Sequence, residues 1–166
     1  KANMSERSII ALGGNLGDRK ATIKSAIKSI RAIEGVEVVA KSSLYESFAV
    51  TEAGIDKDAP RYLNGVIAIN TSLKPGELLD RLREIETAHG RVRLGKWGSR
   101  TLDIDIITYG TEIKVGKRLT LPHPRAYERA FVLLPWVEIE PEATLLGHGS
   151  VAELAEGVKD QVWLLK

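Results

Sequence analysis

Residues 8–35 read SIIALGGNLGDRKATIKSAIKSIRAIEG, which joins a short apolar run to a helical repeat. The run at residues 8–12 predicts a buried strand, and the glycine-rich segment at residues 13–18 predicts a tight turn after it. From about residue 19 to residue 33, isoleucines recur at helical spacing, so we expect a helix with one apolar stripe. Gly35 is typical of the position just after a helix, and we expect it to end this one.

The same strand-then-helix pattern returns in the next part of the chain. Residues 36–47 alternate and carry β-branched side chains, which predicts a strand. Residues 49–61 mix glycine, proline and charges without a period, so we expect a loop there. Residues 62–73 predict a second long strand. Pro75 then stands where a helix favours its first residue, and apolar residues at helical spacing follow until Gly90.

The remaining elements are shorter. We expect a basic loop at residues 91–99, a strand at 102–109, a small hairpin around Gly116, a short helix ending before Pro135 and another near 151–156. The resulting order is strand, helix, strand, strand, helix, strand, followed by additions. This order predicts an α+β fold with a ferredoxin-like βαββαβ core, in which an antiparallel sheet carries helices on one face, plus C-terminal additions.

Length and composition limit the classes of protein to be considered. A chain of 166 residues favours one domain covering residues 1–166, and we expect residues 1–4 to be partly vector-derived, ahead of a native start at Met4. The absence of cysteine excludes disulfides and cysteine zinc sites and suits a cytoplasmic protein. The net charge of +2 is too small to predict a nucleic-acid partner, and no apolar run is long enough for a membrane span.

Asp103 and Asp105 give the sharpest chemical signal, because they alternate with apolar residues in the strand predicted at 102–109. Side chains two residues apart share a face of a strand, so the Cα atoms of the two aspartates lie roughly 6.5–7 Å apart and their carboxylates repel each other. Mg²⁺ prefers oxygen ligands and usually takes one or two carboxylates besides phosphate oxygens and water, which makes it a natural partner. A solvated strand face whose acids pair with arginines is the alternative.

Arg91, Arg93, Lys96 and Arg100 lie just before this pair. Guanidinium groups bind phosphate oxygens in a bidentate manner, so an acidic pair beside a basic cluster suits a nucleotide bound with its metal. An ordinary exposed loop would carry the same basic run. Trp97, within the cluster, either stacks on a flat heterocycle or anchors the loop.

Three further features leave a choice open. His123, between two prolines, either donates to a phosphate or acts as an acid, or else it is a structural hydrogen-bonded residue. The glycines of residues 13–17 match neither the Walker pattern nor the dinucleotide fingerprint, so we interpret them as a strand-to-helix turn. Asn64 either binds the polar edge of a heterocycle or packs at the end of its strand.

Taken together, these segments resemble the 6-hydroxymethyl-7,8-dihydropterin pyrophosphokinase family in order and spacing from about residue 8 to residue 141. The matching segments are residues 12–18, 62–64, 86–93, 97–105 and 118–124. The run Trp-Gly-x-Arg-Thr-x-Asp-x-Asp is the most specific of them. The resemblance implies a transferase of folate biosynthesis that uses ATP as co-substrate. It would move pyrophosphate to the hydroxyl of 6-hydroxymethyl-7,8-dihydropterin and release AMP.

The resemblance also implies roles for single residues. The implied metal ligands, for two Mg²⁺ ions, are Asp103 and Asp105. The implied catalytic residues are Arg91, Arg100, Asp103 and Asp105. The residues expected to bind ATP are Glu86, Arg91, Arg93, Trp97, Arg100, Ile106, Arg118, Thr120, His123 and Arg129. The residues expected to bind the pterin are Ser47, Val50, Tyr62, Asn64, Trp97 and Phe131.

The family further suggests two loops, 47–60 and 91–98, that close over the substrates, and a monomer with no nucleic-acid or membrane partner. The sequence departs from the family pattern in places. Arg83 stands where a neutral residue that contacts adenine can occur, and Phe48 with Ala49 replaces a proline pair of some members. These departures leave the details of the first loop open.

Three other functions compete with this interpretation. A ferredoxin-like RNA-binding module would need aromatic residues on its sheet, yet aromatic content is 5% and the usual RNA-binding motif is absent. A two-metal phosphoesterase would need more metal ligands than two aspartates. A regulatory domain that only binds a small molecule would not explain basic residues beside the acidic pair.

Overall fold

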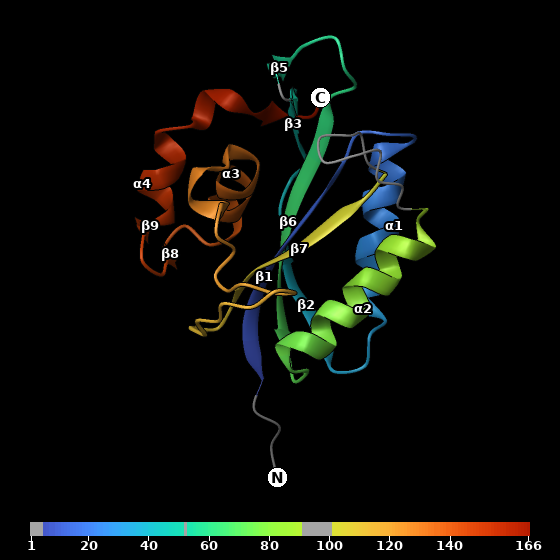
Figure 1. Cartoon of the computed structure of the whole chain (residues 1–166), viewed down its shortest axis with the longest axis vertical. Coiled ribbons are helices and arrows are strands. Elements are labelled where there is room, and N and C mark those ends of the chain that lie inside the picture. The colour runs from blue at the N-terminus through green and yellow to red at the C-terminus, as the bar shows by residue number, and fades with distance from the viewer. Residues whose placement is uncertain (1–4, 52, 91–100) are drawn as a thin grey trace.

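A computed structural model describes residues 5–51, 53–90 and 101–166 of the chain (Figure 1). Within them, the main sheet has six strands in the order β10-β3-β6-β1-β7, and β2 also pairs with β6. These strands are β1 (Glu6–Gly14), β2 (Val36–Lys41), β3 (Tyr45–Ser47), β6 (Tyr62–Thr71), β7 (Asp103–Tyr109) and β10 (Trp163–Leu164). Every pairing between them is antiparallel. An antiparallel sheet with helices is therefore confirmed.

Strand β1 lies at the centre of the sheet and sets the register of the two strands beside it. It pairs with β6 along its whole length, and on its other side Gly13 lies opposite Asp103 and Ala11 opposite Asp105. The pairing with β7 shifts between Ile9 and Ile10. The two aspartates thus face small residues across the ladder, which leaves open space above the end of β1.

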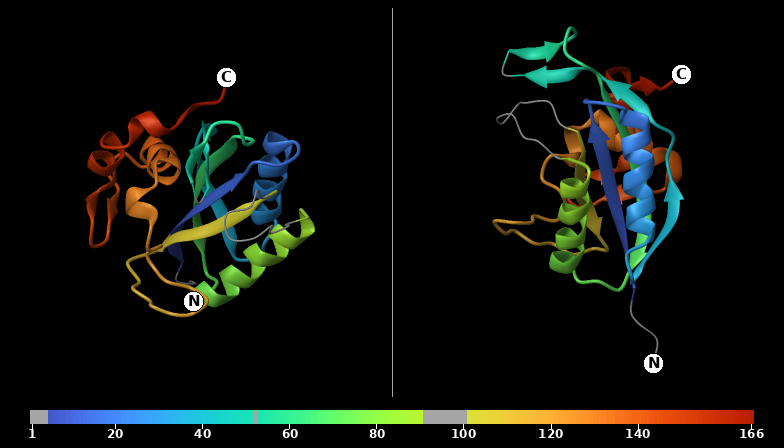
Figure 2. Two further views of the ribbon diagram at one scale, coloured as in Figure 1. Left: turned by 45° about the horizontal axis from the view of Figure 1, so that its top comes forward. Right: turned by 90° about the vertical axis from the view of Figure 1, so that its right-hand side faces the viewer.

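Two helices cover one face of the sheet, α1 (Arg19–Arg31) and α2 (Pro75–Ala88) (Figure 2). Helix α1 starts because Asp18 caps it, accepting a hydrogen bond from the backbone N–H of Ala21 at 3.1 Å. Helix α2 starts at Pro75, whose missing N–H costs nothing in the first turn. Their buried stripes pack on the sheet through residues such as Ile30 and Leu82, both fully buried.

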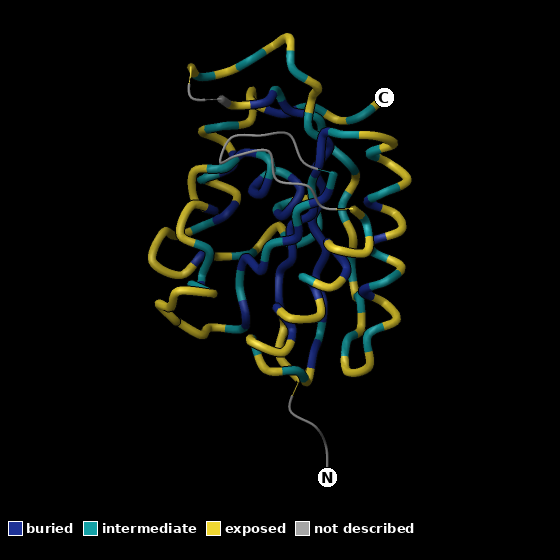
Figure 3. Tube along the Cα trace, turned by 45° about the vertical axis from the view of Figure 1, so that its right-hand side comes forward, coloured by how far each residue is buried: buried dark blue, intermediate teal, exposed yellow. Residues whose placement is uncertain are grey.

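The other face is covered by the C-terminal part of the chain. Its elements are η1 (Ala126–Glu128), α3 (Ala130–Ile139), β8 (Thr144–Leu145), β9 (Gly149–Ser150), α4 (Val151–Glu156) and η2 (Lys159–Gln161). Trp136 and Leu133 of α3 pack on Val66 and Ile107 of the sheet. Figure 3 shows the buried strands running between the two layers. None of the helices in the described ranges has both the length and the apolar character needed to cross a bilayer.

Most predicted elements are present, and five predictions were wrong in detail, four of which concern strands, turns and the end of the first helix. The strand predicted at 36–47 is broken into β2 and β3. The loop predicted at 49–61 contains a hairpin, β4 (Ala49–Thr51) and β5 (Gly54–Asp56). Around Gly116 the described residues contain a single bridge instead of a hairpin, between Lys114 and Leu121. The first helix ends at Arg31, so Gly35 lies in the following turn, with φ of 89°.

The helix predicted to end before Pro135 continues through it to Ile139. Proline removes the N–H that would bond to the carbonyl of Phe131, four residues earlier, which normally disfavours a helix interior. Pro135 is buried between Leu133 and Trp136, which pack on the sheet, and this burial offsets the lost hydrogen bond. Tertiary packing therefore overrides the local preference at this position.

Candidate active site

A cavity of about 600 Å³ lies at the end of β1, between the β4–β5 hairpin, the start of α3 and β10. The residues lining this larger cavity include all the described residues that were predicted to bind the pterin, namely Ser47, Val50, Tyr62, Asn64 and Phe131. They come from four separate elements, so the fold brings together what the sequence keeps apart. Trp97, predicted for the same role, lies outside the described residues.

The floor of the larger cavity is held by a buried polar pair. Asn64 is 4% exposed, and its side-chain amide donates a hydrogen bond to the hydroxyl oxygen of Ser47 at 3.1 Å. A Cβ atom on Gly13 would come within 2.7 Å of the Asn64 Oδ1 atom. The glycine in the motif at residues 13–17 therefore makes room for this amide, which goes beyond the turn predicted from the sequence.

The rim of the larger cavity is apolar and exposed. Val50 and Ile55 lie opposite each other in the β4–β5 hairpin and are 52% and 66% exposed. Both line the cavity, as does Phe131 on the opposite wall. The Arg129 guanidinium lies 5.4 Å from the centre of the Phe131 ring. A flat, partly apolar molecule would bury these groups on binding.

A second cavity, of about 210 Å³, opens beside the first. Its walls include the predicted ATP-binding residues Ile106, Arg118, Thr120 and His123. Arg83 and Lys117 also line it, so positive side chains dominate this smaller cavity. Arg118 forms an ion pair with Asp80 at 2.6 Å, and both side chains are more than half exposed. The arrangement suits a polyanion that enters from solvent.

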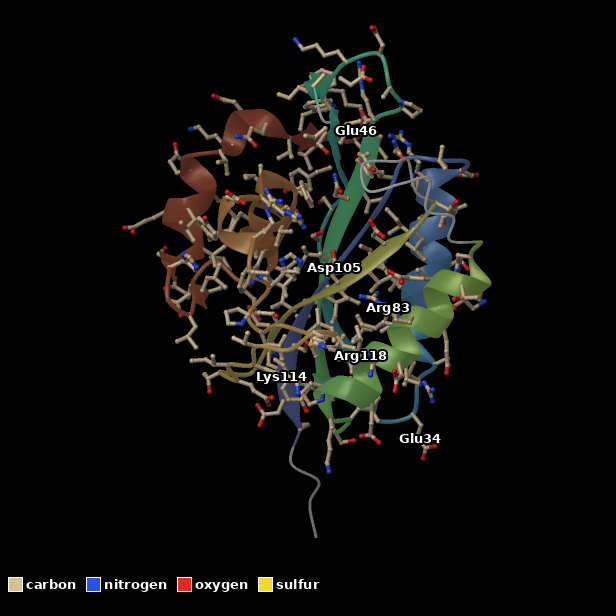
Figure 4. The ribbon with its side chains drawn as sticks, viewed as in Figure 1. Glu34, Glu46, Arg83, Asp105, Lys114 and Arg118 are labelled. Carbon is tan, nitrogen blue, oxygen red and sulfur yellow. The ribbon has the colours of Figure 1, made fainter. Side chains whose placement is uncertain are left out.

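Asp105 lines both cavities, whereas Asp103 lines only the larger one. Figure 4 shows Asp105 on β7 in the middle of the molecule, with Arg83 and Arg118 near it toward α2. Both aspartates are half-buried, and Ile104 between them is fully buried on the opposite face. The alternation predicted from the sequence is therefore confirmed.

Two carboxylates in this position fit Mg²⁺ by the chemistry of their atoms. The described residues contain no group of three or more histidine, aspartate or glutamate side chains arranged for a metal. Asp103 and Asp105 offer hard oxygen atoms on one face, beside a cavity lined by cations. Mg²⁺ usually uses one or two carboxylates and completes its shell with water and substrate phosphates. The pair fits such an ion and fits a zinc centre poorly.

His123 is fixed by its backbone and by one ring nitrogen. Its N–H donates to the carbonyl of Ile107 at 2.8 Å, and its Nδ1 atom accepts the N–H of Arg125 at 3.2 Å. Burial lowers the pKa of His123, and the nearby arginines act in the same direction, against the attraction of Asp105. The neutral ring thus carries its proton on Nε2, where it can donate a hydrogen bond to an anion.

Some residues that were predicted to bind ATP do not line the smaller cavity. Glu86 is 1% exposed, and its Oε2 atom accepts the N–H of Ile104 at 2.6 Å and pairs with Arg83 at 2.9 Å. These contacts hold β7 against α2, and Glu86 is absent from the described walls of both cavities. Arg129 lines the larger cavity instead of the smaller one, and burial lowers its pKa. Arg91, Arg93, Lys96 and Arg100 lie outside the described residues.

Several cavity residues were missed by sequence reasoning, and the aromatic ones among them matter most for the shape of the larger cavity. Phe48, Val162 and Trp163 line the larger cavity. Phe48 carried a usable signal, because it follows Ser47 directly in a segment already assigned to the pocket. Trp163 carried none, since it reaches the cavity only through pairing with a strand far away in the sequence.

Known proteins of one family match this chain over most of its length. The model of the family described as 7,8-dihydro-6-hydroxymethylpterin-pyrophosphokinase (HPPK) matches residues 9–141. A 2-amino-4-hydroxy-6-hydroxymethyldihydropteridine pyrophosphokinase of Haemophilus influenzae is 40% identical over 151 residues, covering 91% of this chain and 92% of its own length. The Bacillus subtilis enzyme of the same name is 40% identical over 167 residues, covering 98% and 93%.

Solved structures share the fold. The wild-type Plasmodium falciparum HPPK-DHPS, crystallised with pterin and p-hydroxybenzoate, superposes with a TM-score of 0.70 at 13% identity. The superposition covers 99% of this chain and 46% of the Plasmodium chain, so this chain spans less than half of that protein. At this identity the likeness concerns the fold alone.

Proposed function

We propose, because this chain belongs to the 7,8-dihydro-6-hydroxymethylpterin-pyrophosphokinase family, that its two cavities bind the two substrates of the family's reaction. That reaction transfers pyrophosphate from ATP to the hydroxyl of 6-hydroxymethyl-7,8-dihydropterin in folate biosynthesis. The observation that carries the proposal is the position of Asp105 in the walls of both cavities. A carboxylate at this junction can act on a phosphate chain from one side and on a hydroxyl group from the other.

The larger cavity is proposed to hold the pterin. The side chains of Ser47 and Asn64 would present polar groups to the edge of the ring, while Val50, Tyr62 and Phe131 would cover its faces. Trp97 keeps its predicted role in the same pocket. The exposed apolar hairpin residues would lose contact with water as the pocket fills, which favours binding.

The smaller cavity is proposed to hold ATP. Arg118, Thr120 and His123 would donate hydrogen bonds to it, and Ile106 would pack against it. The other residues kept as proposed nucleotide contacts are Glu86, Arg91, Arg93, Trp97, Arg100 and Arg129. Cations around the triphosphate would offset its charge before and during transfer.

Asp103 and Asp105 are proposed to bind two Mg²⁺ ions. Once bound, the metal would offset the charge of the triphosphate and make the attacking hydroxyl more acidic. Their spacing along β7 supports the assignment, because both carboxylates lie on the side of the strand that faces the larger cavity. Arg91 and Arg100 are proposed to complete the catalytic set.

Catalysis is proposed to depend mainly on positioning. The pterin hydroxyl oxygen would form a bond to the β-phosphorus of ATP, and the bond from that phosphorus to the oxygen that bridges the α- and β-phosphates would break, releasing AMP. The hydroxyl proton would pass to solvent. The walls around Asp105 would hold the two reacting groups together, which supplies much of the rate enhancement in phosphoryl transfer. The segment 47–60, which contains the β4–β5 hairpin, and the segment 91–98 would exclude water by closing over the substrates.

We propose that the main sheet and the two helices α1 and α2 form a ferredoxin-like core. The strand order β7-β1-β6-β2, with α1 and α2 on one face, supports a ferredoxin-like core with C-terminal additions. We further propose that residues 1–166 form a single domain and that the protein is a cytoplasmic monomer with no nucleic-acid or membrane partner. The lack of cysteine agrees with a reducing compartment.

The test is AMP formation from ATP and Mg²⁺, with and without 6-hydroxymethyl-7,8-dihydropterin. We expect AMP only when the pterin is present, and we expect EDTA to abolish it. AMP formed without the pterin would indicate a hydrolase. A well-folded protein that forms no AMP under any of these conditions would refute the proposal.

A further inference from the structure

The C-terminal strand β10 returns to the edge of the sheet beside the larger cavity. Trp163 pairs with Glu46 of β3, and the N–H of Leu165 donates to the carbonyl of Leu44 at 2.9 Å. Figure 1 shows the C-terminus next to β3, at the end of the molecule that carries the hairpin. The family model ends at residue 141, so β10 lies beyond the part of the chain that the family model matches, although its partner β3 lies within it.

Trp163 makes two specific contacts across this edge. Its indole N–H donates to the Oε1 atom of Glu46 at 3.1 Å. Its ring meets the ring of Phe48 edge to face, with the centres 5.0 Å apart and the planes at 62°. Edge-to-face aromatic pairs have a preferred geometry, so this contact orients the Phe48 ring as well as burying it.

Glu46 ties this contact to the first helix and to the loop before β6. Its side chain is 14% exposed and lies 3.0 Å from Arg19 and 3.9 Å from Arg61. The Arg61 guanidinium lies 5.5 Å from the centre of the Phe48 ring and 5.6 Å from that of Trp163. Glu46 therefore holds the Trp163 ring through its N–H, and Arg61 lies within cation–π distance of both rings.

Phe48 and Trp163 both line the larger cavity, and Val162 lines it between η2 and β10. Phe48 directly follows Ser47, which accepts the hydrogen bond of Asn64 on the cavity floor. A shift of the Phe48 backbone would move Ser47 and so disturb the polar pair. The position of Trp163 therefore affects both the wall of the larger cavity, through Phe48, and its floor, through Ser47.

We propose that Trp163 is a positioning and specificity-determining residue for the flat heterocyclic substrate. It holds Phe48 in the orientation that narrows the larger cavity and forms part of the wall itself. A wall already ordered before binding loses less conformational entropy when the ligand arrives, so it strengthens binding. The inference rests on the proposed function, which assigns the pterin to this cavity.

The experiment compares Trp163→Ala, Trp163→Phe and the control Leu164→Ala. Leu164 is the neighbouring residue of β10, is 54% exposed and lies outside the cavity wall. For each protein we would measure the Kd of the pterin by calorimetry with Mg²⁺ and a non-hydrolysable ATP analogue. The KM of each substrate, kcat and the melting temperature would be measured in parallel.

Trp163→Ala should raise the Kd and KM of the pterin roughly tenfold, because both ring packing and the hydrogen bond are lost. The KM of ATP and kcat should stay within about twofold of wild type. Trp163→Phe should lie between, since it keeps a ring and loses the bond to Glu46. Leu164→Ala should bind the pterin as wild type does.

A double-mutant cycle tests whether Trp163 acts through Phe48. If it does, Trp163→Ala should weaken pterin binding much less in a Phe48→Ala background than in wild type. Equal pterin Kd in the Trp163 variants and Leu164→Ala would overturn the inference. So would a parallel rise in both KM values that follows a lower melting temperature. Failure of the proposed function would instead be seen in the wild type, as a lack of pterin-dependent AMP.

Discussion

The two cavities beside Asp105 differ in the kind of side chains that line them and in how those side chains are held. The smaller one, of about 210 Å³, is lined by flexible cations such as Lys117 and Arg118, and Arg118 is well exposed. The larger one, of about 600 Å³, has a floor and a wall whose side chains hold one another, as Asn64 holds Ser47 and Trp163 holds Phe48. The smaller cavity therefore presents mainly charge to a ligand, and the larger cavity presents mainly a fixed shape.

This difference predicts how each cavity responds to substitution. Attraction between exposed charges falls off slowly with distance and is shared among several side chains, so one lost cation should cost little. A rigid pocket depends on close contacts, so one added methyl group should cost more. Asp105 belongs to both cavities and should be the most sensitive position of all.

Asp105→Asn changes a residue that lines both cavities, so it should have the largest effect of the substitutions considered. The amide keeps the shape and loses the charge, so we expect kcat to fall by at least about a thousandfold. Turnover should be measured as pterin-dependent AMP release, with the melting temperature as the check on folding. Activity within tenfold of wild type would contradict the proposed metal site.

Gly13→Ala tests the rigidity of the larger cavity. The new Cβ would lie 2.7 Å from the Asn64 Oδ1 atom, so the amide must move and lose its alignment with Ser47. We expect the pterin Kd to rise about tenfold, with the ATP Kd unchanged. Gly76→Ala is the matched control, because its Cβ would meet nothing within 4 Å. Equal pterin affinity in both variants would refute the role given to Gly13.

Arg118→Ala tests the tolerance of the smaller cavity. We expect the KM of ATP to rise roughly fivefold while the KM of the pterin stays constant, since neighbouring cations remain. Asp80→Asn should act in the opposite direction, because it frees Arg118 from an ion pair of 2.6 Å and so lowers the KM of ATP about twofold. Steady-state kinetics at low ionic strength would show both changes, and a rise in both variants would exclude this role for Arg118.

Tyr45 pairs with Asn64 across the β3–β6 ladder but does not line either cavity, so Tyr45→Phe should leave the affinity for both substrates unchanged. Burial raises the pKa of Tyr45, and so do its hydrogen bond to Glu138 at 2.7 Å and the charge of that carboxylate. The phenol is therefore favoured in the folded state, and its contribution is complete below pH 10 and lost as the pH rises above 10. Urea unfolding should give a wild-type advantage of about 0.5 kcal/mol at pH 8 that shrinks at pH 11. An advantage that grows with pH would contradict the assignment.

The sequence predicts the helices and strands whose residues follow a regular period. The isoleucine stripe of α1 and the alternation around Asp103 and Asp105 follow from one element each, so local period was enough. The hairpin at Ala49–Asp56 was missed because each of its strands has three residues, too few to form a pattern. Helix α3 continues through Pro135 because of packing that only the complete fold supplies.

The residues of the candidate site also fall into two groups, those that short segments of sequence predict and those that only the complete fold brings to the site. Residues on β7 and within short motifs, such as His123, could be predicted because a few neighbouring residues are enough to indicate their chemistry. Trp163 could not, since its partner Glu46 lies 117 residues away and the strand that holds it has two residues. Glu86 was predicted as a nucleotide contact, yet its described contacts join α2 to β7, a role that depends on burial.

The position of β10 also sets the order in which a growing chain completes its site on the ribosome. Everything that lines the smaller cavity, from Leu79 to Pro124, has been synthesised before Asp160 to Trp163 emerge. The residues of the smaller cavity are therefore available in a nascent chain before the final strand can complete the wall of the larger one. Loss of that strand would remove Trp163 from the wall of the larger cavity and leave every described residue of the smaller cavity in the chain.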